Sequence, residues 1–147
     1  MSHSSREIVS LWIDGFPPSD NRRKRWRTAA EKEFYELVAS ARKRFNIPSL
    51  SEPVNCRASL FAPDHRVRDG SNYLKCLCDS LQFSGILEND SLIVQTEVTL
   101  FSKKEISQWT DLPLVLSGGT FVQLFSAIPA YRKESLVSIC SKLRKLK

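Results

Sequence analysis

Acidic residues stand at the ends of segments whose apolar spacing predicts helices and strands. Asp69 comes just before a predicted helix, and Glu88 and Asp90 come just before a predicted strand. Carboxylates that lie close together repel one another, which raises a pKa or recruits a cation. Mg²⁺ is the natural cation, because it takes hard oxygen ligands and keeps several waters that a phosphate can displace. A metal held in this way can activate water and stabilise the charge that develops on a phosphate under attack.

Lys75 could add a positive charge to such a site. It lies about one helical turn past Ser71 on the same face of the predicted helix, where it could contact a phosphate. Each residue also has an ordinary structural explanation. Asp69 can cap the helix that follows it, Asp90 can be a turn residue, and Lys75 can pair with Asp79 four residues further on. The spacing alone leaves both interpretations open.

The chain carries an excess of positive charge, as many proteins that bind polyanions do. Its 22 Lys and Arg residues against 16 Asp and Glu residues give a net charge of +6. One basic cluster surrounds Trp26 and consists of Arg22, Arg23, Lys24, Arg25 and Arg27. A second run closes the chain and consists of Lys142, Arg144, Lys145 and Lys147. These clusters indicate either a phosphate-binding surface or two solvated runs, the second at an ordinary helix end.

The cysteines and the hydropathy pattern exclude several classes of protein. Four cysteines, Cys56, Cys76, Cys78 and Cys140, include no C-x-x-C pair, and neither histidine has a spacing suitable for zinc. Cys56 and Cys78 fall on apolar faces and are interpreted as small core residues. The sequence has no apolar run near the roughly 20 residues that cross a bilayer, and its start lacks the apolar region of a signal peptide. We therefore expect a soluble, cytoplasmic protein with reduced thiols and no membrane partner.

The periodicity of apolar residues predicts one α+β domain of 147 residues, with helices packed on a mixed sheet. Strands are expected over about 8–13, 54–62, 92–101 and 121–128. Helices are expected over about 29–45, from about 71 to the turn at Gly85, and over about 132–147 as a basic C-terminal helix. Because Thr28 and Glu31 form a capping box, the basic cluster should lie in the loop before the first helix. No element is predicted for residues 102–119.

Four blocks of the sequence resemble the signature of the RusA family of Holliday junction resolvases. Residues 66–75 are similar to its basic loop followed by D-x-D-N-x-x-K. Residues 78–81 and 85–91 resemble its D-A-L and G-x-x-x-D-D blocks at ungapped spacing. Residues 17–22 are similar to its P-P-S-x-N-R, and Pro63-Asp64 matches a family dipeptide. The resemblance covers about residues 8–128, with the blocks in the correct order, and the C-terminal helix lies beyond it.

The resemblance implies a homodimeric endonuclease, common in phages and prophages, that serves DNA recombination and repair. Such enzymes cut four-way junction DNA by paired symmetric nicks and use Mg²⁺ or Mn²⁺. Carried over by position, Asp69 and Asp90 match two essential aspartates and would hold the metal, while Lys75 matches an essential lysine. Arg66 and Arg68, in the basic loop, and the cluster around Trp26 would contact the DNA.

Ser71 departs from the pattern, because it stands where the family has its third aspartate. A serine hydroxyl is neutral and is a much poorer Mg²⁺ ligand than a carboxylate. Three interpretations stay open: Ser71 acts through a water on the metal, Asp64 or Glu88 supplies the missing charge, or cleavage is lost while binding remains. The last interpretation makes a catalytically weak or inactive junction-binding protein the alternative function. Ser71 is also a favoured residue at the start of a helix.

Overall fold

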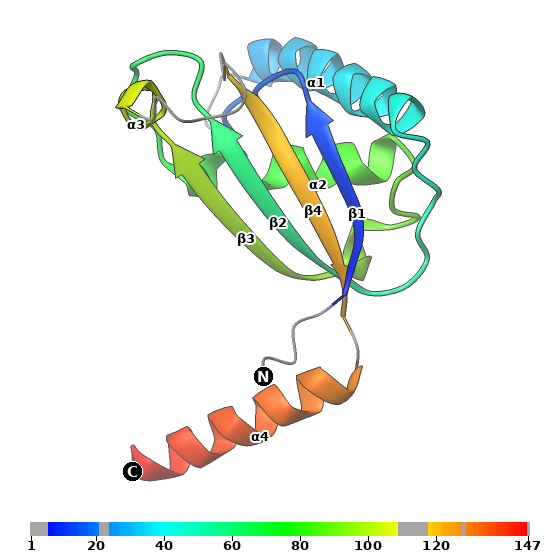
Figure 1. The fold of residues 1–147 in the computed structure, drawn as a ribbon, viewed down its shortest axis with the longest axis vertical. Helices are drawn as coiled ribbons and strands as arrows, with labels where there is room; N and C mark the ends of the chain where they lie inside the picture. Colours follow the sequence, from blue (N-terminus) through cyan, green and yellow to red (C-terminus); the bar gives the residue numbers. More distant parts are fainter. Residues whose placement is uncertain (1–5, 21–23, 109–117, 128, 147) are drawn as a thin grey trace.

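Four segments with alternating apolar residues form one mixed sheet, and two helices cover one of its faces (Figure 1). A computed structural model describes residues 6–20, 24–108, 118–127 and 129–146, except for the side chains of residues 24–28 and 129–135. The strands are β1 (Glu7–Ile13), β2 (Val54–Phe61), β3 (Ile93–Phe101) and β4 (Gly119–Ser126). The helices are α1 (Lys24–Arg44), α2 (Leu74–Phe83), α3 (Lys103–Gln108) and α4 (Pro129–Lys145). Two short 3₁₀ helices, η1 (Gly70–Tyr73) and η2 (Asp90–Leu92), flank α2.

The strand order β1-β4-β2-β3 combines antiparallel and parallel pairing. β4 is antiparallel to both β1 and β2, whereas β2 and β3 are parallel. Parallel neighbours need a crossover connection, and α2 provides it between β2 and β3. The predicted fold class, one α+β domain with helices on a mixed sheet, is confirmed. The crossover also positions the candidate residues, because Asp69 and Lys75 lie at the start of α2 and Asp90 lies between α2 and β3.

The hydrophobic core lies between the sheet and helices α1 and α2. Alternate residues of β2 point into it, and Val54, Ala58 and Leu60 are fully buried. Phe34 and Val38, one turn apart on α1, are buried against the same face. These are the positions at which a period of two predicted a strand and a period of 3.6 predicted a helix. The predicted core faces are therefore confirmed.

The cysteines are free thiols, as the sequence predicts. Cys56 and Cys76 are buried, Cys78 is half-buried and Cys140 is exposed. Burial raises the pKa of the Cys56 thiol to about 12, and the nearby Cys78 adds to the effect. Cys56 therefore stays protonated at neutral pH and packs as a small core residue.

The start of α1 differs from the prediction. The helix begins at Lys24 rather than near residue 29, so Thr28 and Glu31 lie inside it instead of at its start. Lys and Arg are good helix formers, and a run of them extends the helix towards the N-terminus when no breaker intervenes. The end of α1 agrees with the expected stop before Pro48: the helix ends at Arg44, and Asn46 has a left-handed φ of 55°.

Residues 102–119, for which no element was predicted, contain the short helix α3. Its capping box is visible in the hydrogen bonds: the Ser102 amide and hydroxyl both donate to Glu105 Oε1, at 3.3 and 3.1 Å, and the Glu105 amide donates to Ser102 Oγ at 3.1 Å. The sequence therefore held a signal for this helix that was missed. Residues 109–117 lie outside the described residues.

The predicted C-terminal helix is present as α4, which runs away from the sheet in Figure 1. From the middle of α4 onwards its apolar residues are at least half exposed, namely Leu136, Val137, Ile139 and Leu143, as is Leu146 just after the helix. Among the described helices, none combines the length and the hydropathy that a membrane crossing requires.

Candidate active site

The first part of the candidate site is the turn between β2 and α2. Asp69 precedes η1, and its Oδ1 accepts hydrogen bonds from the Ser71 amide at 3.1 Å and from the Ser71 hydroxyl at 2.9 Å. Gly70 passes close to β3, where an added Cβ would lie 3.5 Å from Val98 Cγ1. The capping role considered for Asp69 is therefore real. Both capping bonds go to Oδ1, so the exposed carboxylate can still bind another partner through its second oxygen.

Ser71 stands where the resembled family has its third aspartate. It is exposed, and its hydroxyl points towards Asp69. Its proton is used in that bond, so the hydroxyl oxygen keeps lone pairs that could accept from water or contact a cation. It adds no negative charge. The position thus keeps an oxygen atom but loses the electrostatic attraction that an aspartate would give.

A segment from the other end of the chain meets the start of α2. The Asp20 amide donates to the Asn72 carbonyl at 2.7 Å, and the Lys75 amide donates to Asp20 Oδ2 at 3.4 Å. The Lys75 side chain is exposed at this point of the helix. Asp20 was not among the predicted site residues. The only available signal was its place in the P-P-S-D-N-R block, which does not tell what the block packs against.

Asp90 lies near the other end of α2, where the chain turns into β3. Its amide donates to the side chain of Gln82 at 3.1 Å, and Asn89 caps η2 by accepting from the Ser91 amide at 2.8 Å. Asp90 is therefore part of a turn, as the structural interpretation proposed, but Asn89 does the capping. Both Asp90 and Glu88 are exposed, so their carboxylates face solvent.

The thiol of Cys78 links these segments electrostatically. Burial raises its pKa most, and the negative charges of Asp79, Asp90 and Asp20 raise it further, while a hydrogen bond with Thr96 lowers it. Coulomb effects of this kind reach only a short way through a protein in salt. Asp20 and Asp90, which belong to two separate segments, therefore both lie near enough to Cys78 to raise its pKa.

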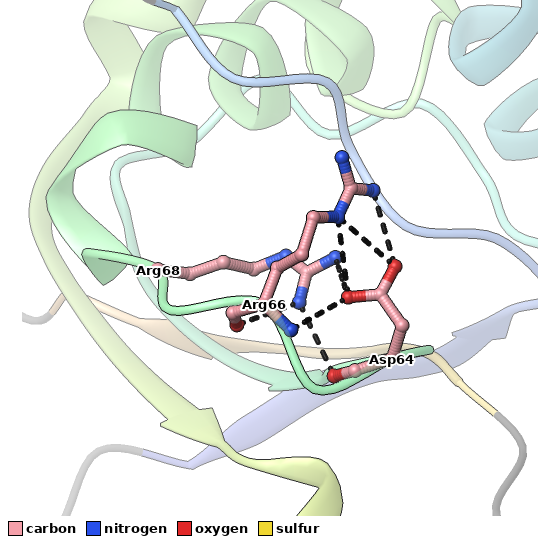
Figure 2. A network of polar contacts seen from close by, with 3 residues as sticks. All are labelled: Asp64, Arg66 and Arg68. Carbon is pink, nitrogen blue, oxygen red and sulfur yellow. Dashed lines mark hydrogen bonds and ion pairs between the residues drawn. The ribbon is translucent and has the colours of Figure 1, made fainter.

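Asp64, one of the two residues considered as a source of the missing charge, is held by arginines. Figure 2 shows its carboxylate between two guanidinium groups, with Arg66 Nη2 at 3.1 Å and Arg68 Nη2 at 2.8 Å. The Arg66 amide also donates to Asp64 Oδ1 at 3.0 Å. These hydrogen bonds, those from Arg66 above all, hold the pKa of Asp64 well below its usual range. A carboxylate neutralised in this way attracts a further cation weakly.

The two predicted DNA contacts in this loop differ in accessibility. The Arg66 side chain is 71 % exposed, whereas that of Arg68 is 7 % exposed and stacks over the Phe16 ring at 5.1 Å. Beside them a cavity of about 590 Å³ opens between this loop and the segment after β1, and Asp69 is part of its wall. Arg66 is thus the better placed of the two to meet a phosphate.

The cluster around Trp26 is only partly within the described structure. Arg22 and Arg23 lie outside the described residues. Lys24, Arg25 and Arg27 belong to the first turn of α1, but their side chains are also outside the description. Their predicted contact with DNA stays a prediction.

Among the described residues, no three His, Cys, Asp or Glu side chains gather closely enough to enclose an ion. Asp69 and Asp90 are both exposed, and each offers the hard carboxylate oxygens that Mg²⁺ prefers. Mg²⁺ is often bound through only one or two carboxylates, with water and phosphate at its other positions.

The family described as endodeoxyribonuclease RusA matches residues 16–108. The chain belongs to the RusA family. No individual curated protein is similar enough to count as a match. The matched region of this RusA-family chain contains Asp20, Asp69, Ser71, Lys75 and Asp90, whereas β1, β4 and α4 lie outside it.

Proposed function

We propose that this RusA-family protein resolves Holliday junctions by paired symmetric nicks and that it requires Mg²⁺ or Mn²⁺. The family is one of endodeoxyribonucleases, which supports a nuclease acting on junctions. The observation that carries the proposal is the placement of Asp69, Lys75 and Asp90. All three are exposed, and all three lie along the single crossover helix α2 and its flanking turns.

Each side chain of the candidate site has its own role in the proposed reaction. Asp69 and Asp90 bind the cation, which supplies an activated water and neutralises charge on the phosphate when it is bound. The exposed ammonium of Lys75 stabilises the negative charge that develops on the phosphate or on the leaving oxygen. Ser71 orients Asp69 by donating its hydroxyl to Oδ1 at 2.9 Å. Positioning of this kind limits the carboxylate to one arrangement before DNA arrives.

Positively charged residues other than Lys75 hold the DNA. Arg66 lies in the loop just before Asp69, and the basic cluster around Trp26 contributes further phosphate contacts. A homodimer suits this function, since a twofold axis places two sites on opposed strands of a four-way junction. Sedimentation at micromolar concentration should therefore show a dimer. A monomer both with and without junction DNA would remove this part of the proposal.

The experiment that tests the activity uses a four-way junction labelled on each strand in turn. With protein and Mg²⁺, nicks should appear at symmetric positions on two opposed strands, and Lys75→Ala should slow them strongly while the junction is still bound. Cutting of linear duplex at the same rate would contradict junction resolution. No nicks in either metal at any concentration would contradict nuclease activity.

Ser71 favours one alternative, a junction-binding protein that cuts weakly or not at all. The chain keeps the basic residues but has only two of the family's three aspartates. The alternative predicts tight binding of the junction in chelator and intact strands after long incubation with Mg²⁺ or Mn²⁺. Binding and cleavage measured on the same junction separate the two functions.

A further inference from the structure

Arg68 is an almost fully buried cation in the loop between β2 and η1. Its side chain is 7 % exposed, and its Nη2 lies 2.8 Å from Asp64 Oδ1. Its Nη1 donates to the carbonyls of Asp64 and Arg66, at 3.4 and 3.2 Å, and these contacts can be followed in Figure 2. A guanidinium that its own loop already encloses is poorly placed to meet a DNA phosphate, which is the role that the family resemblance implied.

One aromatic ring contacts both ends of the turn that carries Asp69. The guanidinium of Arg68, the residue before Asp69, lies over the Phe16 ring, with Cζ 5.1 Å from the ring centroid. Tyr73, four residues after Asp69, meets the same ring edge-on, with the centroids 5.1 Å apart and the planes at 73°. A single residue from another segment therefore holds the turn at its two ends.

The segment that carries Phe16 is in turn attached to the sheet and to η1. The buried Thr120 on β4 donates its hydroxyl to the Gly15 carbonyl at 2.9 Å. On the other side of Phe16, the Asp20 amide donates to the Asn72 carbonyl at 2.7 Å. Phe16 therefore connects the turn of Asp69 to the sheet, and Arg68 provides one of its two contacts with that turn.

We propose that Arg68 is a positioning residue, which holds the turn of Asp69 against Phe16 and so places the carboxylate for cleavage, instead of binding DNA. The inference rests on the proposed function, in which Asp69 binds the cation. Misplacing a reacting group by about 1 Å can lower a rate about a hundredfold, so a residue that touches neither DNA nor the cation can still control cleavage. Arginine suits this role, because its planar fork pairs with a carboxylate and stacks on a ring, which lysine does poorly.

The experiment measures two quantities with the full chain. One is junction binding in chelator over a range of salt concentrations, and the other is the rate constant for a single round of cleavage at saturating protein and Mg²⁺. Arg68→Lys keeps the positive charge but loses the fork, and Phe16→Leu keeps an apolar side chain but loses the ring. Each should lower the rate constant at least about tenfold. The dissociation constant of the junction should stay within about twofold of wild type with an unchanged salt slope, because no phosphate contact is lost.

A double variant and a matched control complete the set. Because the two residues form one contact, Arg68→Lys combined with Phe16→Leu should cut no more slowly than the slower single variant. The control is Arg57→Lys, since Arg57 also pairs with a carboxylate, that of Glu97, and lies over a ring, that of Phe125. It projects from the face of β2 opposite the buried one, away from α2. It should cut as the wild type does, and melting curves should show every variant folded at the assay temperature.

Four results would overturn the positioning role. Cleavage by Arg68→Lys at the wild-type rate would show that the charge alone suffices. A salt slope reduced by about 0.9 in Arg68→Ala would make Arg68 a phosphate contact. Rate losses that multiply in the double variant would mean that Arg68 and Phe16 act separately. Equal slowing in Arg57→Lys would mean that the loss of any paired arginine has this effect.

The Ser71 amide separates this inference from the proposed function. It donates to Asp69 Oδ1 at 3.1 Å, so its resonance in a ¹⁵N-resolved spectrum without DNA or metal reports the placement of that carboxylate. The resonance should move in Arg68→Lys and stay in place in Arg57→Lys. An unmoved resonance in Arg68→Lys would overturn the positioning role. If the wild type cuts no junction in Mg²⁺ or Mn²⁺, the proposed function fails, and this spectrum alone decides whether Arg68 positions Asp69.

Discussion

Two groups of aspartates near α2 and the loop before it differ in how their charge is balanced. Asp64, in the loop that leaves β2, is bound by two arginines and is part of the fold of that loop. Asp20, Asp69 and Asp90, around α2, have no ion pair among the described residues and keep their charge available. The comparison shows that an aspartate in a basic, family-like loop can have its charge balanced by arginines of the same loop. Whether a guanidinium already neutralises it distinguishes the two groups.

The same contrast applies to the arginines. Arg68 is almost fully buried by Asp64 and Phe16, so its charge serves the loop. Arg66 binds the same carboxylate but remains mostly exposed. A basic motif read from sequence therefore overstates the number of cations free for DNA, because it cannot tell which ones an internal carboxylate has already bound.

Asp90→Asn should have the largest effect, because it removes a proposed metal ligand whose charge no cation among the described residues neutralises. Residues that only support metal ligands change activity by about 10–100-fold, so loss of a ligand should lower cleavage by more than about a hundredfold. Junction binding in chelator should persist, because the DNA is held by other residues. The check is a cleavage time course paired with a gel-shift titration. Cleavage within a few-fold of wild type would place Asp90 among the structural aspartates.

The basic cluster around Trp26 comes next. Replacing Arg22, Arg23 and Arg25 by Ala should weaken junction binding and flatten its dependence on salt, by roughly 0.9 unit of logarithmic slope per lost phosphate contact. Arg68→Ala should change the slope little, since that side chain is 7 % exposed. Binding titrations over a range of salt concentrations give both slopes. An unchanged slope in the triple variant would place the DNA on another surface.

Ser71→Asp should have an intermediate effect on cleavage. Restoring the family aspartate should lower the Mg²⁺ concentration needed for half-maximal cleavage about tenfold, because the proposed metal site gains a charged ligand. If Ser71→Asp changes nothing and the wild type cuts well at low Mg²⁺, the lost ligand has already been replaced.

The sequence predicted the parts of this arrangement that depend on local pattern. Alternation located β2, and the run from Leu92 to Phe101 located β3. The family-like blocks placed Asp69, Ser71 and Lys75 at the start of α2 and Asp90 beyond its end. The start of α1 was misplaced because two local signals competed, a capping box at Thr28 and the helix propensity of the basic run before it.

Contacts between segments that are far apart in the chain could not be predicted from local sequence patterns. Lys75 and Asp20 are 55 positions apart, and only the packing of the loop after β1 on α2 brings them together. The pairing of Asp64 with Arg68 is local by comparison, an i,i+4 contact. It was still missed, because the same charges were equally compatible with DNA contacts. Which charges remain available is decided by the fold and not by composition.

Asp64→Asn should have the smallest effect on the site and a specific effect on pH dependence. Since Asp64 already binds two arginines, removing its charge should leave Mn²⁺ affinity within about twofold of wild type, in contrast to Asp90→Asn. The lowered pKa of Asp64 means that its ion pairs stabilise the loop fully above the unfolded-state pKa of about 4. This contribution is lost only as the pH falls further, through the lower pKa of the folded state.

The amide of Arg66 reports this transition, because it donates to Asp64 Oδ1 at 3.0 Å. Its proton chemical shift in a ¹⁵N-resolved spectrum should stay constant on acidification to about pH 4 and move only below it. In Asp64→Asn the shift should not titrate in this range, since the amide group has no proton to gain. A wild-type midpoint at or above about 4 would show that the arginines do not hold the carboxylate in solution. The distinction between the neutralised and the available aspartates would then fail, because Asp64 would be as free for a cation as Asp69.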